Sequence, residues 1–383
     1  MLKWSHQYLW RVKYYIISGE ASGDLHGSNL IKAFKKQDPQ ANIRCWGGDL
    51  MQAAGAELVR HYRDLAFMGF AEVVKNLPTI FKNIRFCKDD ITAFKPDTVI
   101  LIDYPGFNLR IAEWAHKEGI KVIYYISPQV WAWKEGRVKK MKQIIDKMLV
   151  ILPFEKDYYK ERWNWDVDYV GHPLIEAIED KKKELGYQDN HYSTRTKKIA
   201  LLPGSRKQEI SKKLPIMLEV AKSFPDYQFV VAEAPGQESD FYHPFLQAYQ
   251  NVASVKNATY QLLLESDAAL VTSGTATLET ALLRVPEIVC YKGSTISYQI
   301  AKRLIKIKYI SLVNLIMDKL IVTELIQDEL NVANLVKELN LLLNDEAHQK
   351  QLKSDYKALY EKLSKGGHAS DQAAKIITDY LSK

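Results

Sequence analysis

The stretch YYIISGEASGDLHG, from Tyr14 to Gly27, decides the fold. A run of β-branched and aromatic residues, typical of a buried strand, ends in a glycine-rich turn, and a helical pattern follows directly. The turn differs from a dinucleotide-binding fingerprint because its glycines are four residues apart. It also carries Glu20 and Asp24 and has no lysine. The turn therefore fits a phosphate poorly, which leaves open the kind of ligand it serves.

The same alternation of strand and helix patterns continues through both halves of the chain. Apolar runs that end in turns recur in both halves, at 97–103, 121–127, 148–154, 199–206, 227–236 and 267–283. Such continuous apolar strands between helices of 10–15 residues predict a parallel, doubly wound α/β sheet. A lysine-rich polar stretch at 179–198 separates the halves. We therefore expect two Rossmann-like domains, 1–173 and 174–367. A closing helix, 368–383, must bury its apolar stripe, and the first domain is one candidate for its packing partner.

Composition narrows the class of protein. The chain has 383 residues, 47% of them hydrophobic and 26% charged, which is typical of a soluble globular protein. No apolar run approaches the roughly 18–20 residues of a membrane span. His6, Gln7 and Arg11 interrupt the N-terminus, so a signal peptide is not predicted and we expect a cytoplasmic protein. The net charge of +7 favours an anionic partner, for which nucleic acid, a phospholipid surface and a phosphorylated substrate are alternatives.

No metal site, cofactor site or nucleic-acid-binding signature emerges from the motifs. The three cysteines are far apart and the histidines lack metal-binding spacing. Asp166 and Asp168 form a DxD pair, but they alternate within a strand-like segment, which makes a metal role improbable. Tyr104 and Trp131 could stack on bases, yet no RNA-binding fold signature accompanies them. We therefore predict neither a metal nor a cofactor nor a nucleic-acid partner.

Ligands of open α/β sheets bind at the carboxyl ends of the strands, so the turns found there are the candidate sites. In the turn LPGSR, Gly204 allows close backbone approach, Ser205 offers a hydroxyl and Arg206 can fork onto phosphate oxygens. The turn SGTATLE places hydroxyls and a glycine at a helix N-terminus, where phosphate is favoured. The residues proposed from this second turn are Ser273, Gly274, Thr275, Ala276 and Glu279. Simple turn formation and helix capping are the alternatives at both places.

Asp103 ends an otherwise apolar strand, TVILI, within the segment IDYPGFN. A carboxylate at such a position is a candidate general base. A helix N-cap or a turn former ahead of Pro105 is the alternative.

Seven motifs in order together resemble lipid-A-disaccharide synthase, a bacterial glycosyltransferase family. They are SGEASGD (18–24), IDYPGFN (102–108), SPQVWAW (127–133), GHP (171–173), LPGSRKQEI (202–210), SGTATLE (273–279) and AKRLIKIKYISLVNL (301–315). Each is weak alone, but the ordered set is specific and covers nearly the whole chain from Val12. Residues 1–11 have no counterpart in the family pattern.

The resemblance implies a GT-B fold, in which two Rossmann-like domains face each other across a cleft. It implies the reaction of UDP-2,3-diacylglucosamine with 2,3-diacylglucosamine 1-phosphate, giving a β-1,6 disaccharide and UDP with inversion and without a metal. Asp103 matches the family's proposed base, and Arg206, Glu279 and Asn314 match positions tied to UDP binding or activity. The turns of the first domain would then serve the acceptor sugar, which suits their acidity. The residues expected there are Ser18, Glu20, Ser22, Asp24, Asn108, Ser127 and Trp133. For Asp24, capping of the helix that follows the turn is the alternative.

Acylated substrates also imply contact with the cytoplasmic surface of the inner membrane. The segment from Leu65 to Phe81 gathers the apolar residues Phe67, Met68, Phe70, Val73, Val74 and Leu77. Basic residues between 134 and 142 would add attraction to anionic lipid. An ordinary buried amphipathic helix is the alternative, and a homodimer stays an open alternative to a monomer.

Three rival functions share parts of this pattern. They are a MurG-like transferase with another acceptor, a UDP-N-acetylglucosamine 2-epimerase, and a non-catalytic binding module on the same scaffold. The apolar segment 65–81 counts against the epimerase, which needs no acyl-binding surface. The presence of both Asp103 and Arg206 counts against the non-catalytic module.

Overall fold

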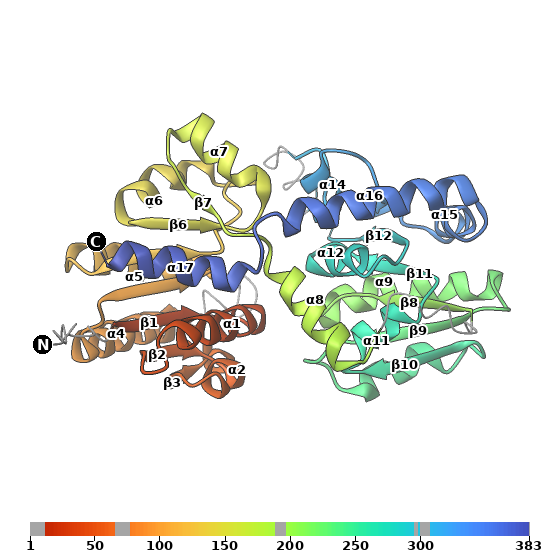
Figure 1. The fold of residues 1–383 in the computed structure, drawn as a ribbon. Coiled ribbons are helices and arrows are strands. Elements are labelled where there is room, and N and C mark those ends of the chain that lie inside the picture. The colour runs from red at the N-terminus through yellow and green to blue at the C-terminus, as the bar shows by residue number, and fades with distance from the viewer. Residues whose placement is uncertain (1–11, 66–76, 188–196, 295–297, 299–306, 383) are drawn as a thin grey trace, which may run out of the picture. The chain divides into compact units, whose positions relative to one another are not determined.

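A computed structural model describes residues 12–65, 77–187, 197–294, 298 and 307–382. The chain forms two compact units (Figure 1). The first unit runs up to Pro173 and takes up the chain again from Lys365 to its end, whereas the second comprises Leu174–Ser364. The predicted membrane-contact residues Phe67, Met68, Phe70, Val73 and Val74, and the side chain of Leu77, lie outside the described part of the chain.

Within the described part of the first unit, seven parallel strands form one sheet in the order β3-β2-β1-β4-β5-β6-β7. The strands are β1 (Lys13–Ser18), β2 (Asn42–Gly47), β3 (Glu57–His61), β4 (Thr98–Ile102), β5 (Lys121–Tyr125), β6 (Lys147–Val150) and β7 (Asp168–Tyr169). The helices are α1 (Ala21–Gln37), α2 (Asp49–Ala53), α4 (Leu77–Phe94), α5 (Pro105–Lys117), α6 (Val138–Ile144), α7 (Pro153–Trp163) and α17 (Ala369–Leu381), and α8 (Pro173–Glu184) leads into the second unit.

Both faces of this sheet are apolar because parallel strands need cover on each side. Alternate residues of one strand therefore enter different cores. In β1, Tyr15 and Ile17 pack with residues of α4, α5, α6 and α7, whereas Tyr14 and Ile16 pack with residues of α1, α2 and α17. This two-sided burial explains why the strands read as continuous apolar runs rather than alternating ones.

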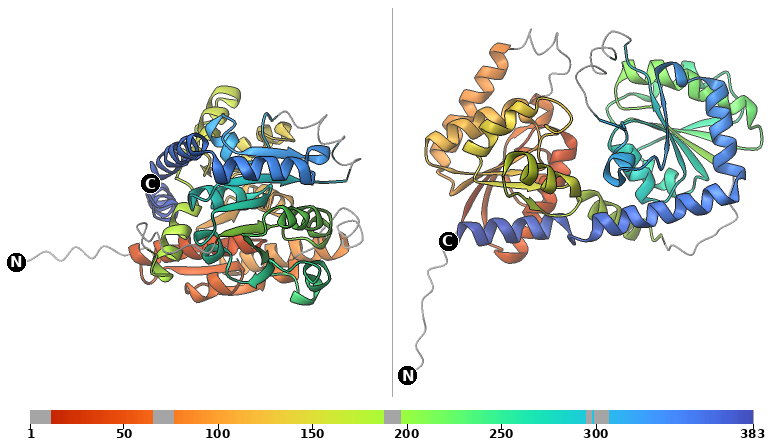
Figure 2. Two further views of the ribbon diagram at one scale, coloured as in Figure 1. Left: turned by 90° about the vertical axis from the view of Figure 1, so that its right-hand side faces the viewer. Right: turned by 90° about the horizontal axis from the view of Figure 1, so that it is seen from above.

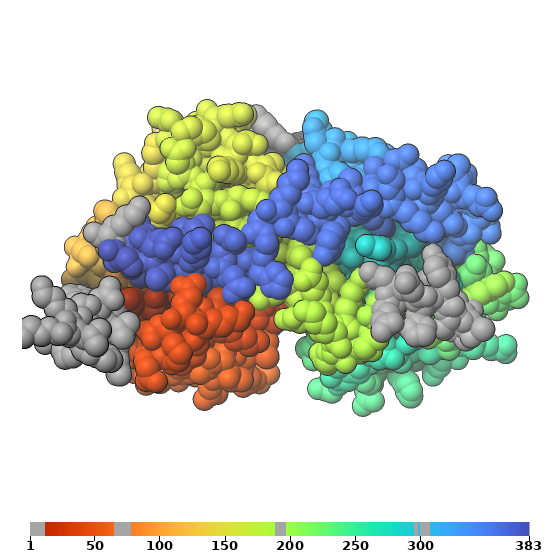
Figure 3. Space-filling view, viewed as in Figure 1, coloured from red at the N-terminus to blue at the C-terminus, as the bar shows by residue number. Residues whose placement is uncertain are grey.

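Helix α17 returns from the end of the chain to the first unit and packs beside α1 (Figure 3). Ala369, Ala373, Ala374 and Ile377 are buried in the core beneath α1. A glycine pair precedes the helix, and a Cβ on Gly366 would lie 2.8 Å from the backbone nitrogen of Gly171. Two segments far apart in the sequence therefore cross at close range here. Because α17 packs against α1 and the core of the first unit, it is part of that unit.

In the described part of the second unit, six parallel strands form a sheet in the order β10-β9-β8-β11-β12-β13. The strands are β8 (Lys198–Leu202), β9 (Gln228–Glu233), β10 (Val252–Lys256), β11 (Ala268–Thr272), β12 (Glu287–Tyr291) and β13 (Thr323–Ile326). The helices are α9 (Lys207–Val220), α10 (His243–Leu246), α11 (Thr259–Leu264), α12 (Thr275–Leu282), α14 (Leu312–Met317), α15 (Val332–Asn344) and α16 (Glu346–Ser364). Helices cover both faces of each sheet, as Figure 2 shows.

In both sheets the order of successive strands reverses at one place, between β1 and β4 in the first unit and between β8 and β11 in the second. The two strands on either side of such a switch point send their connections to opposite faces of the sheet. In open α/β sheets, ligands bind at such a switch point, outside the carboxyl ends of the strands. The fold therefore points to the turns after β1, β4, β8 and β11.

Candidate functional site

Asp103 follows β4 at the switch point of the first sheet. It and Tyr104 both have left-handed backbones, with φ of 44° and 48°. Each such residue costs roughly 1–2 kcal/mol unless its surroundings hold it. Here the Asp103 carbonyl oxygen accepts hydrogen bonds from Tyr124 Oη (2.6 Å) and Asn108 Nδ2 (2.7 Å). The turn is therefore held in a strained shape that the sequence alone did not reveal.

Burial raises the pKa of the Asp103 carboxyl to about 6, and the negative charge of Glu20 adds to the effect. Glu20 lies in the turn after β1, across the switch point, and its side chain is exposed. A carboxylate with a pKa near 6 is ionised at neutral pH yet accepts a proton more readily than an ordinary aspartate. These are the properties that a general base needs.

Three of the residues expected to contact an acceptor sugar are instead buried within the first unit. Ser18 Oγ donates to Glu20 O at 3.3 Å. Asn108 donates to the carbonyl oxygens of Ile102 and Asp103. Ser127 Oγ is 2.6 Å from Tyr159 Oη and donates to Pro128 O. These side chains hold the turns in place through internal hydrogen bonds, and their role in binding an acceptor sugar stays a prediction.

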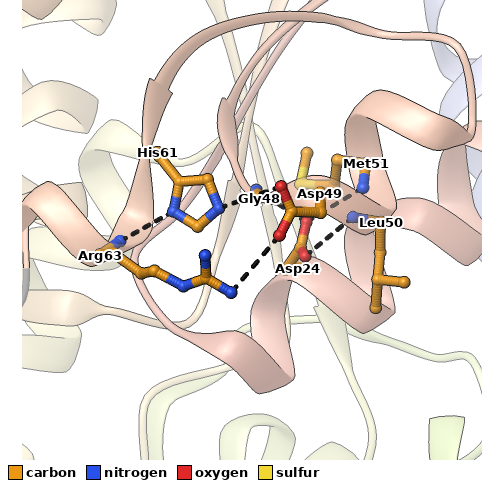
Figure 4. Close-up of polar contacts among 7 residues, drawn as sticks. All are labelled: Asp24, Gly48, Asp49, Leu50, Met51, His61 and Arg63. Atoms are coloured by element: carbon orange, nitrogen blue, oxygen red, sulfur yellow. Dashed lines mark hydrogen bonds and ion pairs between the residues drawn. The ribbon is translucent and has the colours of Figure 1, made fainter.

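Asp24 is also bound within the first unit (Figure 4). Its buried carboxylate accepts hydrogen bonds from the backbone N–H groups of Gly48 (2.8 Å), Leu50 (3.1 Å) and Met51 (3.0 Å). These are the groups at the start of α2 that have no partner within the helix, and a negative charge is favoured there. Asp24 therefore caps α2 rather than its own helix, which gives it a structural role, while the sugar role stays a prediction.

The other acceptor-side candidates, Glu20, Ser22 and Trp133, are exposed. Trp133 is 50% exposed, and the ammonium of Lys134 lies 4.2 Å from its ring. Two further residues of the first unit have structural roles that the sequence did not indicate. Tyr104 covers Gly19 so closely that any side chain at Gly19 would collide with its ring. Glu155 is buried at the start of α7, accepts a hydrogen bond from Trp131 Nε1, and has a pKa raised to about 8 by burial.

In the second unit, the turn after β8 contains Gly204 with φ of 120°, a conformation that favours glycine. Ser205 and Arg206 follow and are exposed. Arg206 Nη1 lies 3.3 Å from Glu209 Oε1, one turn into α9. The side chain of Gln237, in the loop after β9, donates to Ser205 O at 3.0 Å. That loop carried no recognisable motif in the sequence, so its part in holding the turn is new.

The turn after β11 begins α12. Gly274 has φ of 146° and precedes the helix, and Gly274 and Thr275 are exposed. Ser273 Oγ donates to Ile310 O at 3.1 Å, and Ala276 is half-buried. Glu279 accepts a hydrogen bond from Tyr260 Oη at 2.8 Å, and burial raises its pKa. The backbone N–H groups at the start of α12 are thus arranged where an anion is favoured.

Asn314, which the resemblance ties to UDP binding or activity, is fully buried. Its Oδ1 accepts from the backbone N–H groups of Ile321 (2.7 Å) and Val322 (3.0 Å). Its Nδ2 donates to Val322 O and Glu324 Oε1, both at 2.9 Å. Every donor and acceptor of the amide is used internally. Asn314 therefore joins α14 to the start of β13, and any effect on a ligand passes through that connection.

The described residues also form a cavity away from the switch-point turns. A cavity of about 600 Å³ in the second unit is bordered by Ser266 and Asp267 before β11 and by Val285 and Pro286 before β12. It lies at the amino ends of the strands, away from the switch-point turns. In the described ranges, no cluster of acidic, histidine or cysteine side chains is arranged to hold a metal ion. No described helix combines the length and the apolar character needed to cross a membrane.

The two Rossmann-like units define the GT-B class of folds, and solved structures share this fold. The UDP-GlcNAc 2-epimerase of Neisseria meningitidis, solved with UDP-GlcNAc, superposes with a TM-score of 0.64 at 15% identity, covering 97% of this chain and 100% of that one. The calicheamicin glycosyltransferase CalG4 gives a TM-score of 0.61 at 14% identity, covering 97% and 98%. The predicted fold of two Rossmann-like domains is thereby confirmed.

Sequence comparison gives the family. The family model described as lipid-A-disaccharide synthetase matches residues 14–377. The lipid-A-disaccharide synthase of Geobacter metallireducens is 38% identical over 96% of this chain and 97% of its own length. That of Coxiella burnetii is 35% identical over 96% and 98%. The chain belongs to the lipid-A-disaccharide synthase family and is a glycosyltransferase of lipid A synthesis, which confirms the resemblance stated from the motifs.

Proposed function

We propose that this enzyme transfers the sugar of UDP-2,3-diacylglucosamine to the 6-hydroxyl of 2,3-diacylglucosamine 1-phosphate. The products are the β-1,6-linked disaccharide 1-phosphate and UDP. The observation that carries the proposal is Asp103, a partly buried carboxylate with a pKa of about 6 at the switch point of the first sheet. Family membership supplies the substrate class, and Asp103 supplies the chemistry that this class requires.

The reaction needs one base. The Asp103 carboxylate accepts the proton of the 6-hydroxyl as its oxygen attacks the anomeric carbon. The bond from that carbon to the β-phosphate oxygen breaks, and its electron pair leaves with UDP. Attack from the side opposite the leaving group inverts the configuration. A positioned base of this kind contributes about 10²–10⁴-fold in rate.

The leaving diphosphate needs positive charge. Arg206 and the backbone N–H groups of Ser205, Gly274 and Thr275 provide donors at the switch point of the second sheet. Donors arranged in advance for a developing negative charge stabilise it in the transition state. Glu279 is the proposed acceptor for the ribose hydroxyls, with Tyr260 holding its carboxylate. This arrangement requires no metal or cofactor.

We also propose that the enzyme works at the cytoplasmic surface of the inner membrane as a peripheral protein. Lys134, Lys139, Lys140 and Lys142 are exposed along a short stretch that includes α6. Each basic residue near an anionic surface contributes on the order of 1 kcal/mol. Binding to vesicles of phosphatidylglycerol, compared with neutral phosphatidylcholine vesicles, tests this proposal. Equal binding to both kinds of vesicle would contradict it.

UDP release from UDP-2,3-diacylglucosamine, measured with and without the monosaccharide 1-phosphate acceptor, tests the transferase function. We expect release only when both substrates are present, together with a disaccharide product. An epimerase would act on a UDP-sugar without an acceptor, and a MurG-like transferase would need a different one. A non-catalytic module would bind UDP without turnover. Turnover that does not require the acylated acceptor would refute the proposal.

A further inference from the structure

Lys213 is a buried lysine in the second unit that no motif of the sequence singled out. It lies in α9 and is only 3% exposed, whereas its neighbour Lys212 is exposed. Lysine is rarely buried unless its charge is paired, because removing an ammonium from water is costly. The burial of the Lys213 ammonium therefore needs an explanation.

The ammonium lies between the two turns of the proposed diphosphate site. Lys213 Nζ donates to Thr272 Oγ1, at the end of β11 and one residue before the Ser273–Glu279 turn. A Cβ added at Gly204, in the turn after β8, would lie 3.4 Å from the same nitrogen. One side chain thus touches the carboxyl ends of both strands that border the switch point.

The pairing of this charge is incomplete among the described residues. Glu209 Oε2 is 3.9 Å from Lys213 Nζ, which is an ion pair without a hydrogen bond. The other oxygen of Glu209 is 3.3 Å from Arg206 Nη1, so one carboxylate is shared by two cations. An ammonium has three donors, and Thr272 accepts from one of them. The cluster of Arg206, Glu209 and Lys213 therefore carries one net positive charge, part of it buried.

We propose that Lys213 is a positioning residue of the nucleotide site: it fastens the turn after β8 to the turn after β11 and places a buried positive charge beneath the bound diphosphate. The inference rests on the proposed function of these turns. A charge held in a poorly solvated place acts more strongly on a nearby anion than an exposed one, because water screens it less. The diphosphate in turn supplies the negative charge that the cluster lacks.

If Lys213 acts on the diphosphate, its loss should weaken the binding of UDP and leave the binding of uridine nearly unchanged. Lys213→Met keeps the length and apolar stem of the side chain but removes the charge. We expect UDP to bind the variant about tenfold or more weakly, in the range of one charge-assisted hydrogen bond. Uridine, which has no phosphate, should bind with an affinity within about twofold of the unmodified enzyme. Lys212→Met, the same change at the exposed neighbour, is the matched control and should leave both affinities unchanged.

Calorimetric titration of UDP and uridine into the full-length enzyme and its variants measures these affinities. Thr272→Val removes the hydroxyl that Lys213 contacts and serves as a second variant, should Lys213→Met not fold. It should weaken UDP more than uridine, and in the double variant it should add nothing to the loss caused by Lys213→Met. Equal losses for UDP and uridine, additive losses, or an unchanged UDP affinity would each overturn the inference. If the unmodified enzyme itself bound no UDP, the proposed function would fail instead, and the two failures are thereby distinguished.

Discussion

Replacing Asp103 by asparagine should remove most of the turnover and at the same time make the first unit more stable at neutral pH. Both effects follow from the same buried charge. Burial and Glu20 disfavour the ionised carboxylate in the folded state, which is why the pKa of Asp103 rises to about 6. Asparagine has nearly the same shape but carries no charge.

The magnitude follows from the pKa difference. An unfolded aspartate has a pKa near 3.8, and 1.36 kcal/mol for each pKa unit between 3.8 and about 6 gives about 3 kcal/mol. Because the folded state binds the proton more tightly, the wild-type protein loses this stability as the pH rises from 3.8 to 6. Above pH 6 the whole cost is present, and below pH 3.8 it is absent. The variant avoids it at every pH.

Thermal unfolding at pH 4 and pH 8 measures the effect. For a unit of this size 1 kcal/mol corresponds to about 2–4 °C, so Asp103→Asn should unfold up to roughly 6–12 °C higher than wild type at pH 8. The gain should be far smaller at pH 4. Asp157→Asn, at an exposed carboxylate of α7, is the control and should change little at either pH.

The kinetic half of the prediction uses the same variant. UDP affinity should be kept while kcat falls by about 10²–10⁴-fold. A variant no more stable than wild type at pH 8 would refute the buried-charge reasoning. A variant with unchanged turnover would remove Asp103 as the base, whatever its stability.

Three further predictions concern the surroundings of these sites. Glu20→Gln removes a negative charge that raises the pKa of Asp103. The acidic limb of the pH profile of kcat/KM, where activity is lost as Asp103 is protonated, should therefore move to lower pH. An acidic limb that stays in place would mean that Glu20 does not act on Asp103. Arg206→Ala should weaken UDP binding about 10-fold to 150-fold by calorimetry, the range of a charge-assisted hydrogen bond, whereas Lys207→Ala, an equal charge change on the next residue, should not. Asp24→Ala leaves three N–H groups at the start of α2, two of them buried, without a side-chain partner and should lower the free energy of unfolding by at least about 2 kcal/mol in urea. Asp49→Ala, at a side chain 68% exposed, should cost far less. Equal losses would contradict the capping role.

The sequence determined the fold class and named the turns that we propose as ligand sites. Strands buried on both faces must be apolar throughout, and the helices between them force a parallel sheet, so runs such as TVILI and IALL read directly as strands. The turns after such strands collect at one edge of the sheet. For this reason Asp103, Arg206 and the Ser273–Glu279 turn could be named as candidate site residues from the sequence. Ordered motifs then gave the family.

The tertiary structure alone decided which way each polar side chain points and what it contacts. Asp24, Asn108 and Asn314 follow patterns that suit a ligand, but their side chains bond to backbone groups of the same unit. The groups that Asp24 binds are distant in the sequence, whereas those bound by Asn108 and Asn314 are nearby in the chain. Lys212 and Lys213 are adjacent lysines that the sequence does not distinguish. The orientation of α9 on its sheet buries Lys213 and leaves Lys212 exposed. Burial and neighbouring charge depend on residues distant in the chain, so the pKa of Asp103 and the fastening of the two turns by Lys213 could not be deduced from local pattern.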